Sequence, residues 1–223
     1  MTSQFKFEEL MKQRHSCRRF LSKPIPQNLL KQILSTSLLT PSWANSQPWK
    51  IYVLTGNALE EVRKIWVTKS SEKIKGYSDI PTGHRTDFCE RAQKNMEENA
   101  KRVGEKINDP TLAYLFQANY ELFSSPAVVY LTLQKGHTQW SVYDLGALGM
   151  SIMLAAKDLG IDSIVAYELV KYPDILRKYA KIPENENVIV GIALGYEDKD
   201  EKMNQFRSSR NSLEEVCKFV EDI

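Results

Sequence analysis

Residues 41–49 read Pro-Ser-Trp-Ala-Asn-Ser-Gln-Pro-Trp. They follow a segment with helical spacing of apolar residues and precede a segment rich in strand-forming residues. Two prolines stiffen the backbone of this run, and the residues between them offer hydroxyl and amide groups. A packed core tolerates few such groups unless each is paired. The run is therefore expected to be a helix-to-strand connection that contacts a ligand, rather than a core element.

A second run of polar residues lies one predicted helix upstream, where residues 14–20 read Arg-His-Ser-Cys-Arg-Arg-Phe. The guanidinium group of arginine suits phosphate, because its planar fork donates two parallel hydrogen bonds. Together the two runs suit a ligand with a phosphate at one end and a flat heteroaromatic ring at the other. The alternative for the second run is a solvated basic turn.

The two runs resemble motifs of the FMN-dependent nitroreductase family. The upstream run has the pattern Arg-x-Ser-x-Arg-x-Phe, and the downstream run has the pattern Pro-Ser-x-x-Asn-x-Gln-Pro-Trp. Residues 143–160 resemble the central helix of that family, and residues 195–216 resemble its C-terminal signature. The resemblance covers nearly the whole chain and is poorest over residues 76–110.

The resemblance assigns the upstream run to one half of an FMN site. It places Arg14, His15 and Ser16 at the phosphate and ribityl side of the cofactor, and Arg18 at the N1/O2 edge of the ring. A cation at that edge would stabilise the negative charge that develops when the flavin is reduced.

The downstream run is assigned to the other half of the site, largely from the partner subunit. The resemblance places Pro41, Ser42, Trp43 and Asn45 around FMN. Asn45 and Gln47 can each donate and accept hydrogen bonds, as the pyrimidine edge of a flavin requires. Trp43 stands where a small residue is frequent in the family, so it is expected either to cover the ring or to narrow the substrate pocket.

Two later segments complete the cofactor site that the resemblance implies. The chain at Ala166, Tyr167 and Glu168 is expected to run over one flavin face, with the backbone N–H of Tyr167 directed at N5. Arg207 and Arg210, which follow the last predicted strand, resemble a second phosphate clamp. The alternatives are an ordinary strand end for the first segment and a surface charge for Arg207.

Hydrophobic spacing and turn residues predict an α+β fold in one domain over residues 1–223. Helices are expected around Phe5 to Met11 and over residues 26–40, 58–69, 85–103 and 140–159, with Pro26 as a first helical residue and a short last helix after Ser212. Strands are expected over residues 50–55, 127–133, 161–166 and 187–194. The resemblance implies a central mixed or antiparallel sheet flanked by helices, in an intertwined homodimer.

Composition excludes several classes of protein. The chain has 223 residues, 42% hydrophobic and 26% charged, with a net charge of +2, so no nucleic-acid partner is indicated. Three cysteines and three histidines show no ligand spacing, and no metal site is expected. No apolar stretch reaches membrane-spanning length and no signal peptide is recognised, so a cytoplasmic protein without membrane contact is expected.

The resemblance implies an oxidoreductase in which NADH or NADPH reduces FMN and leaves, and a small aromatic acceptor then takes the electrons from the same pocket. The absence of a Rossmann fingerprint agrees with this ping-pong scheme. No catalytic side chain is required, because the cofactor performs the chemistry. The alternatives are another flavin reaction on the same fold, such as enone reduction, reductive dehalogenation or oxidation of a peptide-bound heterocycle, and a flavin carrier or redox sensor without turnover.

Overall fold

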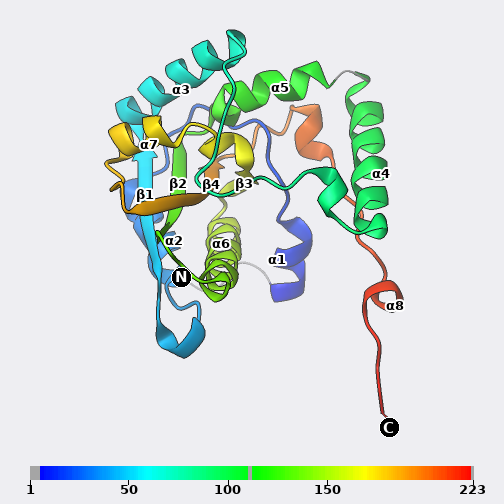
Figure 1. The fold of residues 1–223 in the computed structure, drawn as a ribbon. Coiled ribbons are helices and arrows are strands. Elements are labelled where there is room, and N and C mark those ends of the chain that lie inside the picture. Colours follow the sequence, from blue (N-terminus) through cyan, green and yellow to red (C-terminus); the bar gives the residue numbers. More distant parts are fainter. Residues whose placement is uncertain (1–5, 110–111, 222–223) are drawn as a thin grey trace.

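A four-stranded antiparallel sheet forms the centre of the protein in the computed structural model, which describes residues 6–109 and 112–221 (Figure 1). The strands are β1 (Trp49–Thr55), β2 (Ala127–Gln134), β3 (Asp162–Ala166) and β4 (Glu186–Gly195), in the order β1-β2-β4-β3. The all-antiparallel pairing and the separate helices confirm the α+β class.

Helices pack on both faces of this sheet. The α-helices are α1 (Phe7–Gln13), α2 (Gln27–Ser37), α3 (Gly56–Ser71), α4 (Glu90–Ile107), α5 (Ala113–Tyr120), α6 (Gln139–Asp158), α7 (Pro173–Ala180) and α8 (Leu213–Val216). Short 3-10 turns are η1 (Trp43–Asn45), η2 (Arg85–Asp87), η3 (Leu122–Ser124), η4 (Tyr167–Val170) and η5 (Lys202–Gln205).

The strand β2 joins the two halves of the core, because its alternate side chains point to opposite faces of the sheet. Val128 and Tyr130 pack with α3 and α7 in one apolar cluster, whereas Val129 and Leu131 pack with α2 and α6 in the other. All four side chains are fully buried. Burial of each such side chain stabilises the fold by roughly 1.5–3 kcal/mol.

The structure confirms the predicted strands and the six predicted helices, with small shifts at their ends. Pro26 caps α2 instead of opening it, and α4 begins at Glu90 because Arg85 belongs to a separate turn. Ser212 and Glu215 form the expected capping box of α8. The helices α5 and α7 were not predicted. Phe5, which was assigned to the first helix, lies outside the described residues.

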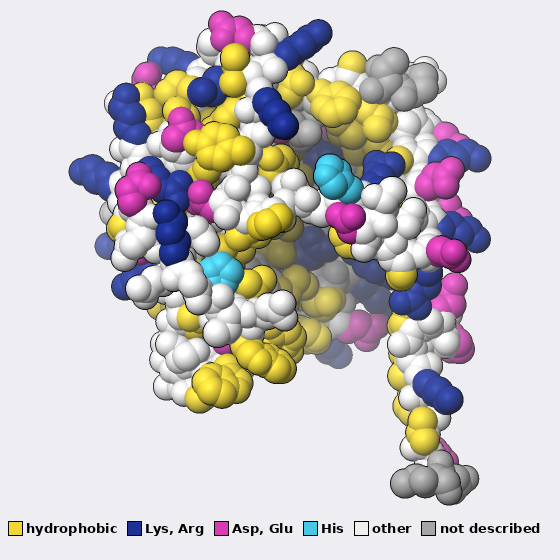
Figure 2. Space-filling model, in the orientation of Figure 1, with side chains coloured by type: hydrophobic (Ala, Val, Ile, Leu, Met, Phe, Trp, Pro, Cys, Tyr) yellow, Lys and Arg dark blue, Asp and Glu magenta, His cyan; other side chains and the backbone are white. Residues whose placement is uncertain are grey.

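The chain after η5 leaves the body of the protein and runs beside α4 before extending away from it (Figure 1, red). Figure 2 shows the same segment projecting from the lower right of the molecule, with a hollow between it and the body. Four large apolar side chains on this extension are exposed: Leu213, Val216, Phe219 and Val220. Among the described residues, no helix combines the length and the apolar character needed to span a bilayer.

Candidate functional site

The upstream run crosses the end of the sheet beside β3. Ser16 forms a parallel bridge with Ser163, and the backbone N–H of Cys17 donates to the carbonyl of Ser163 at 3.0 Å. Phe20 packs so closely over Gly195 that a Cβ there would lie 2.7 Å from the ring. Glycine is therefore required at this position of β4 for the run to reach the sheet.

Side chains of the run alternate in burial, as the strand-like backbone dictates. His15 and Cys17 are buried, whereas Arg14, Ser16 and Arg18 are half-buried and line a cavity of about 810 Å³. Arg207 and Arg210 line the same cavity from the C-terminal segment. With His15, which also lines this cavity, six of the predicted cofactor contacts thus meet on one wall within a single chain.

None of the described carboxylates forms an ion pair with the guanidinium groups of this wall. Burial, with the positive charges of Arg210 and Arg207, lowers the pKa of Arg14, and burial also lowers the pKa of Arg18. The Nε of Arg14 is buried without a hydrogen-bond partner. Such a cluster is stabilised by an anion with several acceptor oxygens, and a phosphate group fits that requirement.

A buried asparagine, Asn204 of η5, joins the two segments that form the wall. Its Oδ1 accepts from the backbone N–H of Arg18 at 2.7 Å, and its Nδ2 donates to the carbonyl of Arg19 at 2.7 Å. Its own carbonyl accepts from Arg207 at 2.5 Å. Sequence reasoning missed Asn204, although a polar residue between apolar Met203 and Phe206 in the C-terminal signature was an available signal.

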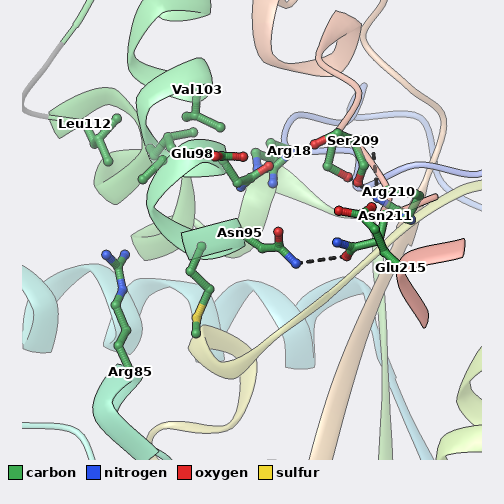
Figure 3. A pocket seen from close by; sticks show the side chains of 15 residues that line it. Arg18, Arg85, Asn95, Glu98, Val103, Leu112, Ser209, Arg210, Asn211 and Glu215 are labelled. Atoms are coloured by element: carbon green, nitrogen blue, oxygen red, sulfur yellow. Dashed lines mark hydrogen bonds between the residues drawn. The ribbon is translucent and has the colours of Figure 1, made fainter. Parts of the chain in front are cut away.

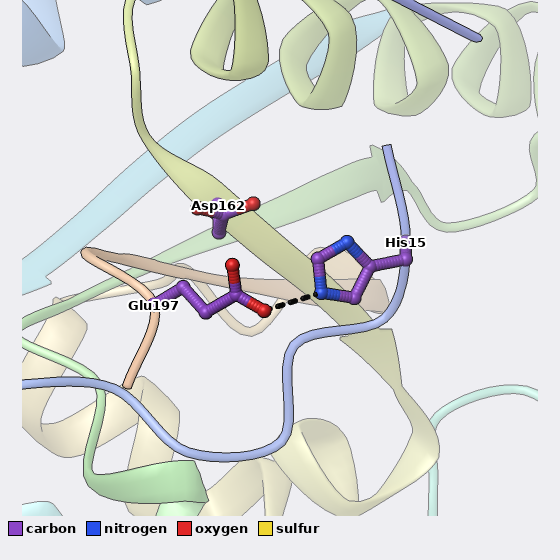
Figure 4. A group of neighbouring side chains, drawn as sticks. All are labelled: His15, Asp162 and Glu197. Atoms are coloured by element: carbon purple, nitrogen blue, oxygen red, sulfur yellow. Dashed lines mark hydrogen bonds and ion pairs between the residues drawn. The ribbon is translucent and has the colours of Figure 1, made fainter. Parts of the chain in front are cut away.

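His15 lies beside two acidic residues that are far away in the sequence, Asp162 and Glu197 (Figure 4). Its Nε2 lies 2.9 Å from Glu197 Oε1, and its Nδ1 lies 3.1 Å from the carbonyl of Gln13. One ligand atom from each of His15, Asp162 and Glu197 lies within 4.8 Å of the others. Asp162 is already paired with Lys157 at 2.7 Å. The contact of His15 with Glu197 therefore fixes the upstream run.

The downstream run forms an exposed loop that is held by α6 and by its own side chains. Asp144 of α6, which is buried, accepts from the backbone N–H of Trp43 at 3.0 Å. Ser42 Oγ accepts from the backbone N–H of Gln47 at 2.9 Å, and the Gln47 side chain donates to Asn45 Oδ1 at 3.0 Å. The side chain of Trp43 is 66% exposed.

Three non-glycine residues of this loop have positive φ: Ala44 at 47°, Asn45 at 56° and Gln47 at 43°. Such conformations cost about 1–3 kcal/mol each and are concentrated at functional sites. The loop, in blue below β1 in Figure 1, lies on the other side of α6 from the α4 and α8 region. None of residues 41–47 lines either cavity found among the described residues. Within one chain, the upstream and downstream runs therefore do not line a common cavity.

The turn after β3 is held from inside the protein. The side chain of Glu168 pairs with Lys171 at 2.5 Å, and Trp66 donates its indole N–H to the carbonyl of Glu168 at 2.8 Å. Burial raises the pKa of Glu168, against the opposing effect of Lys171. Ala166, Tyr167 and Glu168 do not line the two cavities of the described chain, although their neighbour Val165 does.

A second cavity of about 690 Å³ lies between α4 and the C-terminal segment (Figure 3). It shares four lining residues with the first cavity: Arg18, Asn99, Ser208 and Arg210. Asn95 of α4 donates to Asn211 Oδ1 at 2.9 Å across one side. The helix α4, which lies in the segment where the family resemblance is poorest, thus lines this second cavity.

Comparisons with known proteins show the family and the fold. The chain matches the nitroreductase family over residues 11–196. It is 28% identical to chloronitrobenzene nitroreductase of Comamonas testosteroni, with 99% of each chain covered, and 23% identical to 4-nitrobenzoate reductase of Pseudomonas putida, with 96% and 95% covered. The crystal structure of the FMN-dependent nitroreductase NfnB from Mycobacterium smegmatis, in complex with NADPH, superimposes with a TM-score of 0.88 at 25% identity, covering 96% of this chain and 97% of that chain.

Proposed function

Because the chain belongs to the nitroreductase family, we propose that it is an FMN-dependent oxidoreductase that uses NADH or NADPH to reduce nitroaromatic, quinone or similar electron-poor acceptors. The observation that carries this proposal is the cluster of Arg14, Arg207 and Arg210 on one cavity wall, where no described carboxylate pairs with them and the Nε of Arg14 is buried without a partner. Its chemistry fits the phosphate of FMN, and the cavity beside it has room for a flat ring.

Different residues of the wall would bind different parts of the cofactor. Arg14, Arg207 and Arg210 would hold the phosphate, and Ser16 would donate to the ribityl chain, with His15 fixing the backbone between them. Arg18 would face the N1/O2 edge of the ring, where its charge favours the reduced cofactor. When bound, FMN supplies a hydride acceptor at N5 and passes electrons to the second substrate.

The turn after β3 would support the other end of the ring. Ala166 and Tyr167 follow Val165 out of the sheet, and the backbone N–H of Tyr167 would donate to N5. The side chain of Glu168 points inward to Lys171, so its contribution would be to hold the turn.

A second copy of the chain would complete the site. Pro41, Ser42, Trp43, Asn45 and Gln47 are presented outward on a strained, anchored loop and would cover the flavin of the partner subunit. The exposed apolar side chains of the C-terminal extension would be buried in the same homodimer.

Donor and acceptor would bind in turn on the same exposed flavin face, which gives a ping-pong reaction. The residues of this chain would orient the substrates and exclude water, and water itself would protonate the product. A related alternative is reductive dehalogenation, since the chain is also 25% identical over 96% of its length to an iodotyrosine dehalogenase homologue of Caenorhabditis elegans.

The proposal is tested by the visible spectrum and the reactivity of the purified protein. It predicts a yellow protein with one dissociable FMN per chain, bleached by NADH or NADPH without oxygen and reoxidised by a nitroarene. Varying the nitroarene at several donor concentrations should give parallel double-reciprocal lines. A colourless protein that does not bind added FMN would refute the proposal. Reoxidation by a halogenated phenol but not by a nitroarene would favour dehalogenation.

A further inference from the structure

We propose that Asn99 of α4 binds the pyrimidine edge of the flavin from within the same chain, pairing its amide with the N3–H and a neighbouring carbonyl. This inference rests on the proposed FMN site and adds a contact from the segment that resembles the family least. Asn99 is the residue of α4 that lines both cavities, and it does so together with Arg18, Ser208 and Arg210.

The amide oxygen of Asn99 is left without a partner. This Oδ1 atom is buried and accepts no hydrogen bond from the residues that the structure describes. An unsatisfied buried polar atom costs about 1–3 kcal/mol, so a ligand that supplies a donor at this place would recover that free energy. The charged residues that line both cavities are Arg18 and Arg210, and neither donates to this oxygen, so the N–H group of a ligand is the fitting donor.

The position of Asn99 is fixed by its neighbours one turn away on the same face of α4. Asn95 is bonded to Asn211, and Val103 is buried against Met203 and Phe206. The helix therefore cannot turn Asn99 away from the cavity without breaking both anchors. A contact held in this way loses little entropy when a ligand binds.

A flavin ring presents the complementary pattern. Its pyrimidine edge carries one N–H donor between two carbonyl acceptors, and an asparagine amide offers one acceptor and two donor hydrogens. Asn45 and Gln47 offer the same groups, but in this chain they bond to each other. Because Arg18 would hold the N1/O2 edge, the next position along the ring is N3, where Asn99 would bind.

The test compares binding of FMN and of 3-methyl-FMN, which has no N3–H, to protein stripped of its flavin. Wild-type protein should bind FMN about five- to tenfold more tightly than 3-methyl-FMN, the range of one or two neutral hydrogen bonds. Asn99→Leu should weaken FMN by about the same factor and leave 3-methyl-FMN nearly unchanged, so that the ratio approaches one. Lys101→Leu is the control on the same helix, since Lys101 is exposed and lines neither cavity, and it should keep the wild-type ratio.

Two results would overturn the inference. Equal weakening of both flavins by Asn99→Leu would mean that Asn99 only supports the shape of α4. Unchanged affinity for both, with a raised KM for NADH or NADPH, would assign Asn99 to the donor instead. Wild-type protein that binds neither flavin would refute the FMN site itself, which is a separate outcome of the same titration.

Discussion

The two motif runs are held by the fold in opposite ways. Residues 14–20 lie against β3, bury alternate side chains and direct Arg14 and Arg18 into a cavity of their own chain. Residues 41–49 leave α2, turn through strained backbone outside the core and expose the side chains that would contact a ligand. The difference supports the proposal that one chain builds the cationic half of a site and presents the other half to a second copy.

Mixing two defective chains gives the largest effect that this division predicts. Arg14→Glu should destroy the cationic half, and Asn45→Asp with Gln47→Glu should destroy the presented half. Each homodimer should then lack activity. A heterodimer should contain one intact site of its two, because the wild-type halves of both chains meet there. Co-expression with two affinity tags, followed by flavin content and nitroarene reduction, measures this.

The control combines two variants that are both defective in the cationic half of the site. Chains with Arg14→Glu and with Arg210→Glu both damage the cationic wall, so their heterodimer should have no intact site and should recover nothing. Equal recovery in both mixtures would show that the sites are not shared between chains.

The next largest effect concerns Arg14 alone. Arg14→Ala should weaken FMN binding by roughly 10- to 150-fold, because a charge-assisted hydrogen bond to phosphate is worth about 1.5–3 kcal/mol. Lys12→Ala is the control, since Lys12 lines the same cavity but is exposed and paired with Glu8 at 2.6 Å. Fluorescence titration of stripped protein with FMN measures both. Similar losses in the two variants would mean that only the overall charge of the cavity matters.

A smaller effect is expected on the presented half, where Asp144 anchors the loop through the backbone N–H of Trp43. Asp144→Ala should release the loop at a cost of about 1.5–3 kcal/mol in the charge-assisted bond. FMN affinity should fall less than in Arg14→Ala, since no direct contact is lost. Limited proteolysis should cut near residue 43 in this variant. Asp144→Asn keeps an acceptor and should resist cleavage, whereas cleavage equal to that of Asp144→Ala would argue against the anchor.

The sequence predicted the fold best where local pattern and packing agree. The run of β2 and the long apolar helix α6 are both buried, so their composition matched their environment. The helix α5 was missed because its apolar residues follow no helical stripe, and it starts at Leu112 in a left-handed conformation. The helix α7 was missed although Pro173 at its first turn and the buried Leu176 were available signals.

Many residues that line the first cavity could be predicted from the sequence, but their arrangement in space could not. Spacing within each run suggested the arginines, but no local pattern could bring His15 to Glu197 across 182 positions. The same holds for Asn204, which ties the two arginine-bearing segments together, and for Asn99, which lies in the segment where the family resemblance is weakest. These contacts arise only when the sheet brings distant segments to one edge.

The last and smallest effect tests how rigidly the upstream run is held. Cys17 lies between Ser16 and Arg18, yet its side chain is buried, and burial raises the pKa of its thiol despite the nearby cations. Thiolate is the reactive form, so a colorimetric thiol reagent at pH 8 should label the exposed Cys89 and Cys217 and spare Cys17 until the protein unfolds. Because the folded thiol titrates above the ordinary value of 9.0, its contribution to stability is present below that pH and is lost as the pH rises further.

Saturating FMN should leave the labelling pattern unchanged, since the run is already held without ligand. Rapid labelling of all three thiols in the native protein would show instead that residues 14–20 open as readily as the loop at residues 41–49, and the contrast between the two halves would then not hold.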